Sequence, residues 1–236
     1  MVENSESFGS FYGDTFVAFL DICGFKQMMQ NPRKAEEALD NFFRIVYEEV
    51  TTSDRLNSIA VSDSAIIFAR DNIPHNDPEE SGDLRDHNKL CSLLACVKKI
   101  ACRMIQIDVA IKGSIAYGPL NYQKRYNGPR VVKAMLLGKA YIEAYSDVEN
   151  GKPKLKIGQI RLNPKSKIKK LLERSQENSS ELSLLKSGNG GYYFYWMLES
   201  MEEHDNFSEE YKNKYDKMYD PIIFVLKEFV HRINVQ

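Results

Sequence analysis

Two aspartates stand out because each lies within an otherwise apolar segment of the chain. Asp21 belongs to FVAFLDICGF and Asp63 to SIAVSDSAIIFA. A carboxylate in such surroundings is costly unless a cation compensates it. Carboxylate oxygens are ligands that Mg²⁺ and Mn²⁺ accept, and such ions can hold polyphosphates. The pair therefore suggests a divalent-cation site at which a phosphorylated substrate could react.

The elements expected to position Asp21 are a strand and a helix joined by a tight turn. Residues 16–20 are continuously apolar, which predicts a buried strand that ends at Asp21. A turn through Gly24 and a helical pattern follow, so backbone N–H groups at the start of the helix could receive an anion. Taken alone, an aspartate after a strand fits a helix cap or a turn former equally well.

The segment around Asp63 predicts a β-hairpin. Residues 58–61 and 65–69 are strand-like, and Ser62-Asp63-Ser64 joins them as a tight turn. This turn places Asp63 at the tip of the hairpin. It is the combination with Asp21, rather than either aspartate alone, that favours a metal site.

In this combination the two segments resemble the catalytic core of the class III nucleotide cyclases. The first strand of that family carries a metal-binding Asp before a Gly-Phe turn, which corresponds here to Asp21 before Gly24-Phe25. Its hairpin carries a second Asp, which corresponds here to Asp63.

Two later segments extend the resemblance over residues 14–150. They are IKGSIAYG at 111–118 and LGKAYIEAY at 137–145, the latter followed by Glu149. The Ser-Asp-Ser hairpin and the Gly-x-Ala start of the second segment look most like the pyrimidine cyclases of the bacterial Pycsar antiphage system.

The resemblance implies an α+β fold with a ferredoxin-like βαββαβ core and a C-terminal α/β extension. We expect residues 1–13 to form an N-terminal tail and residues 14–150 to form the nucleotide cyclase catalytic core. Residues 151–236 are expected to form an extension packed on the core or on a dimer partner. The helices of the core are expected on one face of its sheet, which leaves the other face for a ligand or a second copy.

The resemblance also implies a two-metal mechanism with two Mn²⁺ or Mg²⁺ ions per site. The catalytic residues would be Asp21 and Asp63. The metal ligands would be Asp21, Ile22 through its backbone carbonyl, and Asp63. The nucleotide-binding residues would be Cys23, Gly24 and Phe25 through their N–H groups, and Asn57 or Lys112 as readers of the base.

One departure from the adenylate and guanylate cyclases lies on the helix aligned with residues 138–149. Those enzymes carry an Asn and an Arg there for the ribose and the transition state. This chain has Ile142 or Glu143 at the first position and Ser146 or Asp147 at the second.

A second departure concerns the base. The purine-reading Lys and its polar partner would fall near Ile59 and Met135, which cannot read a purine edge in the familiar way. A pyrimidine nucleotide cyclase is therefore favoured, with UTP as first choice and CTP as second. The reason for this order is that Lys112 could donate to a uracil carbonyl, whereas cytosine presents an amino group in place of O4.

The implied product is a cyclic pyrimidine nucleotide that serves as a second messenger in antiphage defence and is read by a separate effector protein. Two alternatives remain open: a purine nucleotide (adenylate or guanylate) cyclase, and a regulatory module that binds a nucleotide without turning it over. A phosphohydrolase that forms an aspartyl-phosphate fits less well, because it needs a second acid two residues after Asp21, where Cys23 stands.

Composition narrows the classes of partner. The 236 residues include 32 basic and 33 acidic side chains, a balance that gives no electrostatic support for nucleic acid as a partner. No apolar run approaches the roughly 20 residues needed to cross a bilayer. The start, MVENSESFGS, lacks the basic and apolar parts of a signal peptide. We therefore expect a cytoplasmic protein with no membrane segment.

The four cysteines match no zinc spacing and are expected to be reduced thiols. Three of them lie in an apolar helix predicted over residues 88–105, after a polar surface loop predicted over residues 70–88. Cys23 stands alone beside Asp21, facing the phosphates of the proposed site. Nearby cations could make it reactive there, but a simple turn residue is the favoured interpretation.

A homodimer is expected because the core sheet would have one uncovered face. The basic segment 121–129 is predicted to be a loop, and Lys124, Arg125 or Arg130 could reach from it to a nucleotide in the partner. Beyond the core, residues 154–162 predict a strand, and residues 192–196 predict aromatic strand packing rather than base stacking. Residues from about 208 to the C-terminus predict a helix.

Overall fold

The computed structural model describes residues 10–70, 82–126, 132–163, 165–174 and 180–198. The described strands form one eight-stranded sheet in the order β2-β3-β1-β4-β6-β8-β7, with β5 paired to β4. The strands are β1 Phe11–Ile22, β2 Leu56–Val61, β3 Ser64–Ala69, β4 Ile111–Tyr126, β5 Val132–Leu137, β6 Ile160–Asn163, β7 Leu185–Gly188 and β8 Gly191–Phe194. The helices are α1 Phe25–Met28, α2 Pro32–Thr51, α3 Gly82–Gln106, α4 Lys139–Asn150, α5 Lys165–Arg174 and α6 Ser180–Ser183.

The predicted α+β class and the βαββαβ core are confirmed. Strands β2, β3, β1 and β4 lie side by side, and each adjacent pair is antiparallel. Helix α2 connects β1 to β2, and α3 connects β3 to β4. Asn31 caps α2 through a hydrogen bond from the Lys34 N–H of 3.3 Å, and Pro32 occupies the first helical position.

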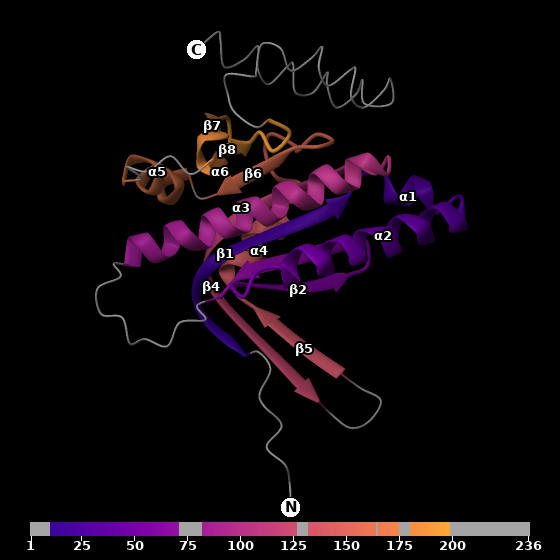
Figure 1. The fold of residues 1–236 in the computed structure, drawn as a ribbon, viewed down its shortest axis with the longest axis horizontal. Helices are drawn as coiled ribbons and strands as arrows, with labels where there is room; N and C mark the ends of the chain where they lie inside the picture. The colour runs from indigo at the N-terminus through magenta and orange to yellow at the C-terminus, as the bar shows by residue number, and fades with distance from the viewer. Residues whose placement is uncertain (1–9, 71–81, 127–131, 164, 175–179, 199–236) are drawn as a thin grey trace, which may run out of the picture.

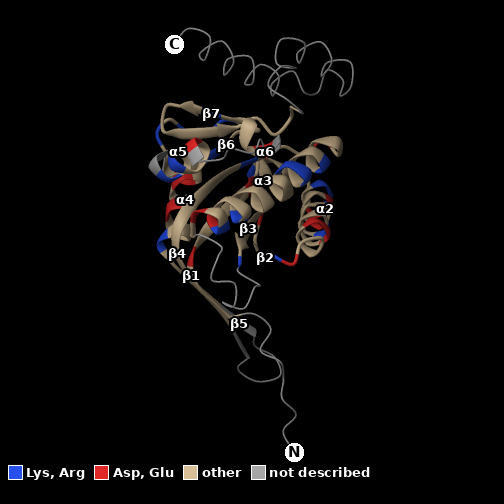
Figure 2. Cartoon of the chain, turned by 60° about the vertical axis from the view of Figure 1, so that its left-hand side comes forward, with Lys and Arg blue, Asp and Glu red and all other residues tan. Residues whose placement is uncertain are grey.

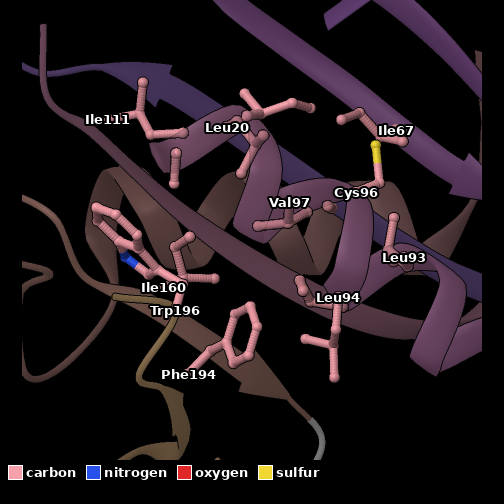
Figure 3. Packing of buried hydrophobic residues seen from close by; sticks show 14 of the residues in the cluster. Leu20, Ile67, Leu93, Leu94, Cys96, Val97, Ile111, Ile160, Phe194 and Trp196 are labelled. Carbon is pink, nitrogen blue, oxygen red and sulfur yellow. The ribbon is translucent and has the colours of Figure 1, made fainter. Parts of the chain in front are cut away.

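Helices α2 and α3 cover one face of the sheet (Figure 1). The apolar side chains of β1 that point to this face are Phe16, Ala18, Leu20 and Ile22. Figure 3 shows Leu20 and Ile67 packed with Leu93 and Val97 of α3. This layer is the main hydrophobic core of the described chain.

The expectation that helices cover one face only was wrong. Helix α4 packs on the opposite face, where Val17 and Phe19 of β1 contact Ala140 and Ala144. The physical reason is present in the strand itself. A continuously apolar run points side chains to both faces of a sheet, so both faces must be covered.

The segment 121–129 was predicted to be a loop, which is wrong for residues 121–126, while residues 127–129 lie outside the described residues. Strand β4 continues through Tyr126 and pairs with β5, from Asn121 opposite Leu137 to Tyr126 opposite Val132. The two strands form an arm that extends away from the rest of the sheet (Figure 1). Arg130 lies outside the described residues, and Lys124 and Arg125 lie on the arm.

The described part of the extension continues the sheet of the core. Strand β6 pairs parallel to β4, with Ile160 opposite Gly113, and β8 pairs antiparallel to β6. The strand predicted over residues 154–162 is shorter and later, at β6. Residues 192–196 are buried, and the Trp196 indole N–H donates to Gly158 O at 2.8 Å. The helix predicted from about residue 208 lies outside the described residues.

Helix α3 begins six residues before the predicted start, at Gly82 rather than 88. The side chain of Cys96 on this helix is buried in the core, and the four cysteines, all within the described residues, form no disulfide. Basic and acidic side chains are interspersed along α2 and α3 (Figure 2). None of the helices in the described ranges has the length and apolar character of a bilayer-spanning segment.

Candidate active site

Asp21 lies one residue before the end of β1, between two polar neighbours on adjacent strands. The register places Ser64 of β3 on one side and Lys112 of β4 on the other. Because side chains alternate along a strand, Asp21 points to the same face as Val17 and Phe19, the face that carries α4. The site therefore lies at one end of the sheet on the α4 side.

Asp63 occupies the two-residue turn between β2 and β3, as the hairpin pattern predicted. Its carbonyl accepts a hydrogen bond of 3.1 Å from the Ile22 N–H, which ties the turn to the end of β1. Ser62, the first residue of the turn, has φ of 54°. The fold thus brings together the ends of two chain segments that are 42 positions apart in the sequence.

Burial is the largest cause that raises the pKa of Asp21 above 3.8, and the nearby charges of Asp63 and Glu149 raise it further. Two partners act in the opposite direction. The Ser64 hydroxyl donates to Oδ1 at 3.0 Å, and Lys112 Nζ lies 3.5 Å from Oδ2. The site consequently holds an excess of negative charge that one lysine does not balance.

This donor set fits a divalent cation. Asp21 and Asp63 supply hard carboxylate oxygens, and the backbone carbonyl of Ile22 lies between them in the chain. Among the residues that the structure describes, no group of three or more His, Cys, Asp or Glu side chains could hold a metal ion. The remaining ligands of Mg²⁺ or Mn²⁺ would therefore have to come from phosphate oxygens and water, as is usual for these ions at nucleotide sites.

The turn after β1 is only partly available to an anion. Gly24 adopts φ of 72°, a left-handed conformation that suits glycine, and leads into the short helix α1. The Cys23 N–H donates to Ala110 O at 2.8 Å, so the prediction that it binds phosphate was wrong. Within the described residues, the N–H groups of Gly24 and Phe25 make no backbone hydrogen bond, while the Phe25 side chain is buried.

The Cys23 thiol does not have the character of a reactive thiol, the less favoured of its two interpretations. Burial raises its pKa to about 11, although a hydrogen bond with the Gly158 backbone and the charge of Lys112 act to lower it. The side chain is therefore a neutral thiol near pH 7, and it is turned toward Gly158 rather than toward a phosphate.

The two predicted base readers lie in different places. Lys112 is at the metal end of the site, against Asp21. Asn57 is on β2 opposite Phe68, which in turn is opposite Val17 of β1. Four residues of strand separate Val17 from Asp21, so Asn57 lies about 13 Å further along the same face.

Helix α4 carries neither of the polar groups that purine cyclases have there. Ile142 is 58% exposed, and Glu143 pairs with Lys139 at 3.5 Å. Asp147 accepts two hydrogen bonds from Arg161 of β6, a residue with no exposed surface. The arginine thus lies on the α4 side of the sheet, where its hydrogen bonds are made within the chain.

The sequence analysis assigned no role to three residues of this region: Ser64, Glu149 and Arg161. Ser64 belongs to the Ser-Asp-Ser tripeptide, but its hydroxyl donates to Asp21 rather than to the adjacent Asp63, a contact that depends on the register of β1 and β3. Glu149 was noticed only as part of the helix pattern. Arg161 gave no local signal, because its partners are distant in the sequence.

Comparisons with known proteins agree with this fold. No protein-family model matches the chain, and no curated protein matches its sequence. A class III adenylyl cyclase-like ATP-binding protein from Pseudomonas aeruginosa superposes with a TM-score of 0.55 at 12% identity, over 84% of this chain and 40% of that protein. A bacterial light-regulated adenylyl cyclase superposes with a TM-score of 0.51 at 10% identity, over 85% of this chain and 98% of the other.

At such low identity the likeness concerns the fold. The chain has the class III cyclase fold, which it shares with bacterial light-regulated adenylyl cyclases and the adenylyl cyclase-like ATP-binding protein.

Proposed function

We propose that the protein is a nucleotide cyclase that converts a nucleoside triphosphate to the 3′,5′-cyclic nucleotide and diphosphate. The observation that carries this proposal is the convergence of Asp21 and Asp63 at the ends of adjacent strands in a class III cyclase fold. Burial and the nearby charge of Asp63 make the Asp21 carboxylate costly without a cation. Two carboxylates at this end of the sheet could hold the divalent cations to which the phosphates of a nucleotide are bound.

The residues of the chain have separable roles in the proposed reaction. Asp21, Asp63 and the Ile22 carbonyl would hold the metal ions, while the N–H groups of Gly24 and Phe25 would bind phosphate oxygens. Two bound divalent ions supply the chemistry that activates the ribose 3′-oxygen and stabilises the departing diphosphate. Ser64 positions the Asp21 carboxylate through its hydrogen bond at 3.0 Å.

We infer UTP as the preferred substrate and CTP as the second. Ile59 and Met135 occupy the places of the purine readers, and both are half-buried apolar side chains. Asn57 is the better-placed reader in the same chain, because its distance along the strand from Asp21 suits a base whose phosphates lie at the aspartates. A carboxamide can both donate and accept. Donation by its amide N–H to O4 of uracil gives UTP as the first choice, and acceptance by its oxygen from the amino group of cytosine allows CTP as the second.

Lys112 cannot read the base of a nucleotide held by its own Asp21, because the base and the phosphates lie at opposite ends of the ribose. Base reading by Lys112 would require a nucleotide held mainly by a second copy. A homodimer is supported by the exposed apolar side chains of Val61 and Ile142, which are 51% and 58% exposed. The proposed biological role remains a second messenger for antiphage defence, with the product read by a separate effector.

A second candidate is a module that binds a nucleotide without cyclising it. The pairing of Asp147 with the buried Arg161 favours it, because this arginine is held by the chain and is not free to stabilise a transition state. The similarity to an adenylyl cyclase-like ATP-binding protein is compatible with this alternative. Retention of both Asp21 and Asp63 argues for the cyclase.

The test incubates the purified full chain with UTP, CTP, ATP or GTP and Mn²⁺ or Mg²⁺, and identifies products by mass spectrometry. We expect cyclic UMP, with less cyclic CMP, and loss of product in Asp21→Asn and Asp63→Asn. Asn57→Ala should change the ratio of UTP to CTP turnover while leaving metal dependence unchanged. Binding of a nucleotide without any cyclic product would favour the second candidate, and equal turnover of purines would overturn the pyrimidine assignment.

A further inference from the structure

Both carboxylate oxygens of Asp21 are engaged by the chain itself. Ser64 Oγ donates to Oδ1 at 3.0 Å, and Lys112 Nζ lies 3.5 Å from Oδ2. Ser64 and Lys112 are the direct cross-strand neighbours of Asp21, so the backbone register fixes all three positions. Among the described residues, Lys112 is the one cation in contact with this carboxylate.

The strand that carries Lys112 is held tightly against β1 at this point. A Cβ at Gly113 would lie 2.6 Å from Leu20 Cδ2 and 3.0 Å from Phe19 O. The absence of a side chain at Gly113 therefore permits the close approach that brings the Lys112 backbone beside Asp21. The contact between Lys112 and Asp21 is therefore a consequence of how β4 packs against β1.

The two partners differ in their freedom to move apart. The Asp21 side chain is 16% exposed, whereas the Lys112 side chain is 25% exposed and sits on a flexible four-carbon stem. The aspartate is fixed by Ser64 on its other side. The ammonium can therefore leave, while the carboxylate stays in place.

A divalent cation on Asp21 would meet this ammonium as a like charge. Repulsion between the two cations weakens metal binding at Asp21 unless the Lys112 ammonium moves away. If the Lys112 ammonium leaves Asp21 and finds no other anion, it stays unpaired at a partly buried position. Phosphate oxygens that arrive with the metal would supply that anion.

We propose that Lys112 is a displaceable counter-ion of Asp21 that makes metal binding depend on the nucleotide. The inference rests on the proposed function insofar as it takes Asp21 to be a metal ligand. Metal alone binds weakly because it competes with Lys112. Metal together with a nucleoside triphosphate binds strongly, because the displaced ammonium pairs with a phosphate. Lys112 acts here as a positioning residue, and the scheme requires no catalytic step from it.

The test measures Mn²⁺ binding directly by electron paramagnetic resonance of the free ion, using the full chain without nucleotide. We expect Lys112→Met to bind Mn²⁺ about tenfold more tightly than wild type, because it removes the competing charge. Lys112→Arg retains the charge and should bind as weakly as wild type. The matched control is Lys169→Met, which removes a lysine that is 66% exposed and paired with Glu173 at 3.7 Å on the surface; it should bind like wild type.

A second titration is made in the presence of UTP. In wild type, UTP should tighten Mn²⁺ binding far more than it does in Lys112→Met, where no ammonium has to be relocated. Lys112→Gln serves as a second neutral variant, and circular dichroism of each variant monitors folding. Equal Mn²⁺ affinity without nucleotide in wild type, Lys112→Met and Lys112→Gln would overturn the inference.

Mn²⁺ binding by Asp21→Asn distinguishes rejection of the role of Lys112 from rejection of the proposed function. If Asp21→Asn abolishes Mn²⁺ binding while the Lys112 variants match wild type, Asp21 is a metal ligand and only the role of Lys112 is rejected. If Asp21→Asn binds Mn²⁺ as wild type does, with and without UTP, then Asp21 is not a ligand and both proposals fail.

Discussion

Arg161 of β6, which is fully buried, holds Asp147 of α4 through two parallel hydrogen bonds. Nε lies 2.9 Å from Oδ2, and Nη2 lies 2.5 Å from Oδ1. Nη1 donates to Pro153 O at 2.8 Å and to the Tyr193 hydroxyl at 3.1 Å. The guanidinium thereby joins the last turn of α4 to strands β6 and β8, so the helix of the cyclase core and the following segment share one polar network.

Arg161→Met should destabilise the protein by about 3–5 kcal/mol, because it leaves the Asp147 carboxylate enclosed without its cation. The free energy of unfolding from urea titration measures this loss. Arg161→Met combined with Asp147→Leu should recover part of it, since neither charge then remains. Lys169→Met is the control, as an exposed ion pair is worth about 0–1 kcal/mol. A loss below about 1 kcal/mol for Arg161→Met would show that the network is not a structural link.

Gly138→Ala should destabilise the start of α4. A Cβ there would be within contact distance of Pro119 O and 2.7 Å from Leu120 Cα, which are backbone atoms of β4. Overpacking of this kind typically costs about 1–3 kcal/mol. Gly82→Ala is the matched control, because nothing lies within 4 Å of the added atom. Similar melting temperatures for the two variants would contradict the tight packing of α4 on β4.

Local patterns were sufficient to predict the elements that carry the two aspartates. The apolar run before Asp21 and the turn residues around Asp63 each specify one element through neighbours in sequence. The order of those elements along the chain then gave the ferredoxin-like core. The end of β4 was predicted wrongly because residues 121–126 include both turn-forming and strand-forming types. Pairing with β5 makes this segment a strand.

Partners across the sheet could not be predicted in the same way. Lys112 meets Asp21 only because β4 is placed beside β1, 91 positions away along the chain. Arg161 becomes a buried residue only when β6 joins the sheet next to β4. Its sequence surroundings, GQIRLN, do not distinguish it from an exposed strand arginine. Such contacts depend on strand order, and a single sequence does not specify strand order through local periodicity.

Cys23 should react slowly with iodoacetamide in the native protein. Its pKa is raised to about 11, mainly by burial, so little thiolate is present at pH 8. After allowance for the higher nucleophilicity of a more basic thiolate, we expect alkylation about tenfold or more slower than that of a peptide thiol. Mass spectrometry of the Cys23 peptide over time measures the rate, with the urea-unfolded protein as control. Rapid modification at pH 7 would show that the thiol is exposed and activated.

The stability contributed by Asp21 should fall as pH rises. Its pKa is raised in the folded protein, chiefly by burial, so the folded state holds the proton more strongly than the unfolded state does. Stability is therefore lost between the unfolded pKa of about 4 and the higher folded pKa. Above that range the ionised carboxylate continues to disfavour the fold.

Asp21→Asn should accordingly be more stable than wild type at pH 7 in the presence of EDTA, because the amide carries no charge to bury. The difference in the free energy of unfolding should shrink as the pH is lowered toward 3.5, where wild-type Asp21 is protonated in both states. Asp40→Asn, at an exposed position on α2, is the control and should differ from wild type by no more than about 0.5 kcal/mol. Addition of Mn²⁺ and UTP should reverse the order of wild type and Asp21→Asn, since a ligand stabilises only the form that binds it. A wild type that is the more stable of the two at pH 7 without metal would show that Lys112 and Ser64 compensate the buried charge fully.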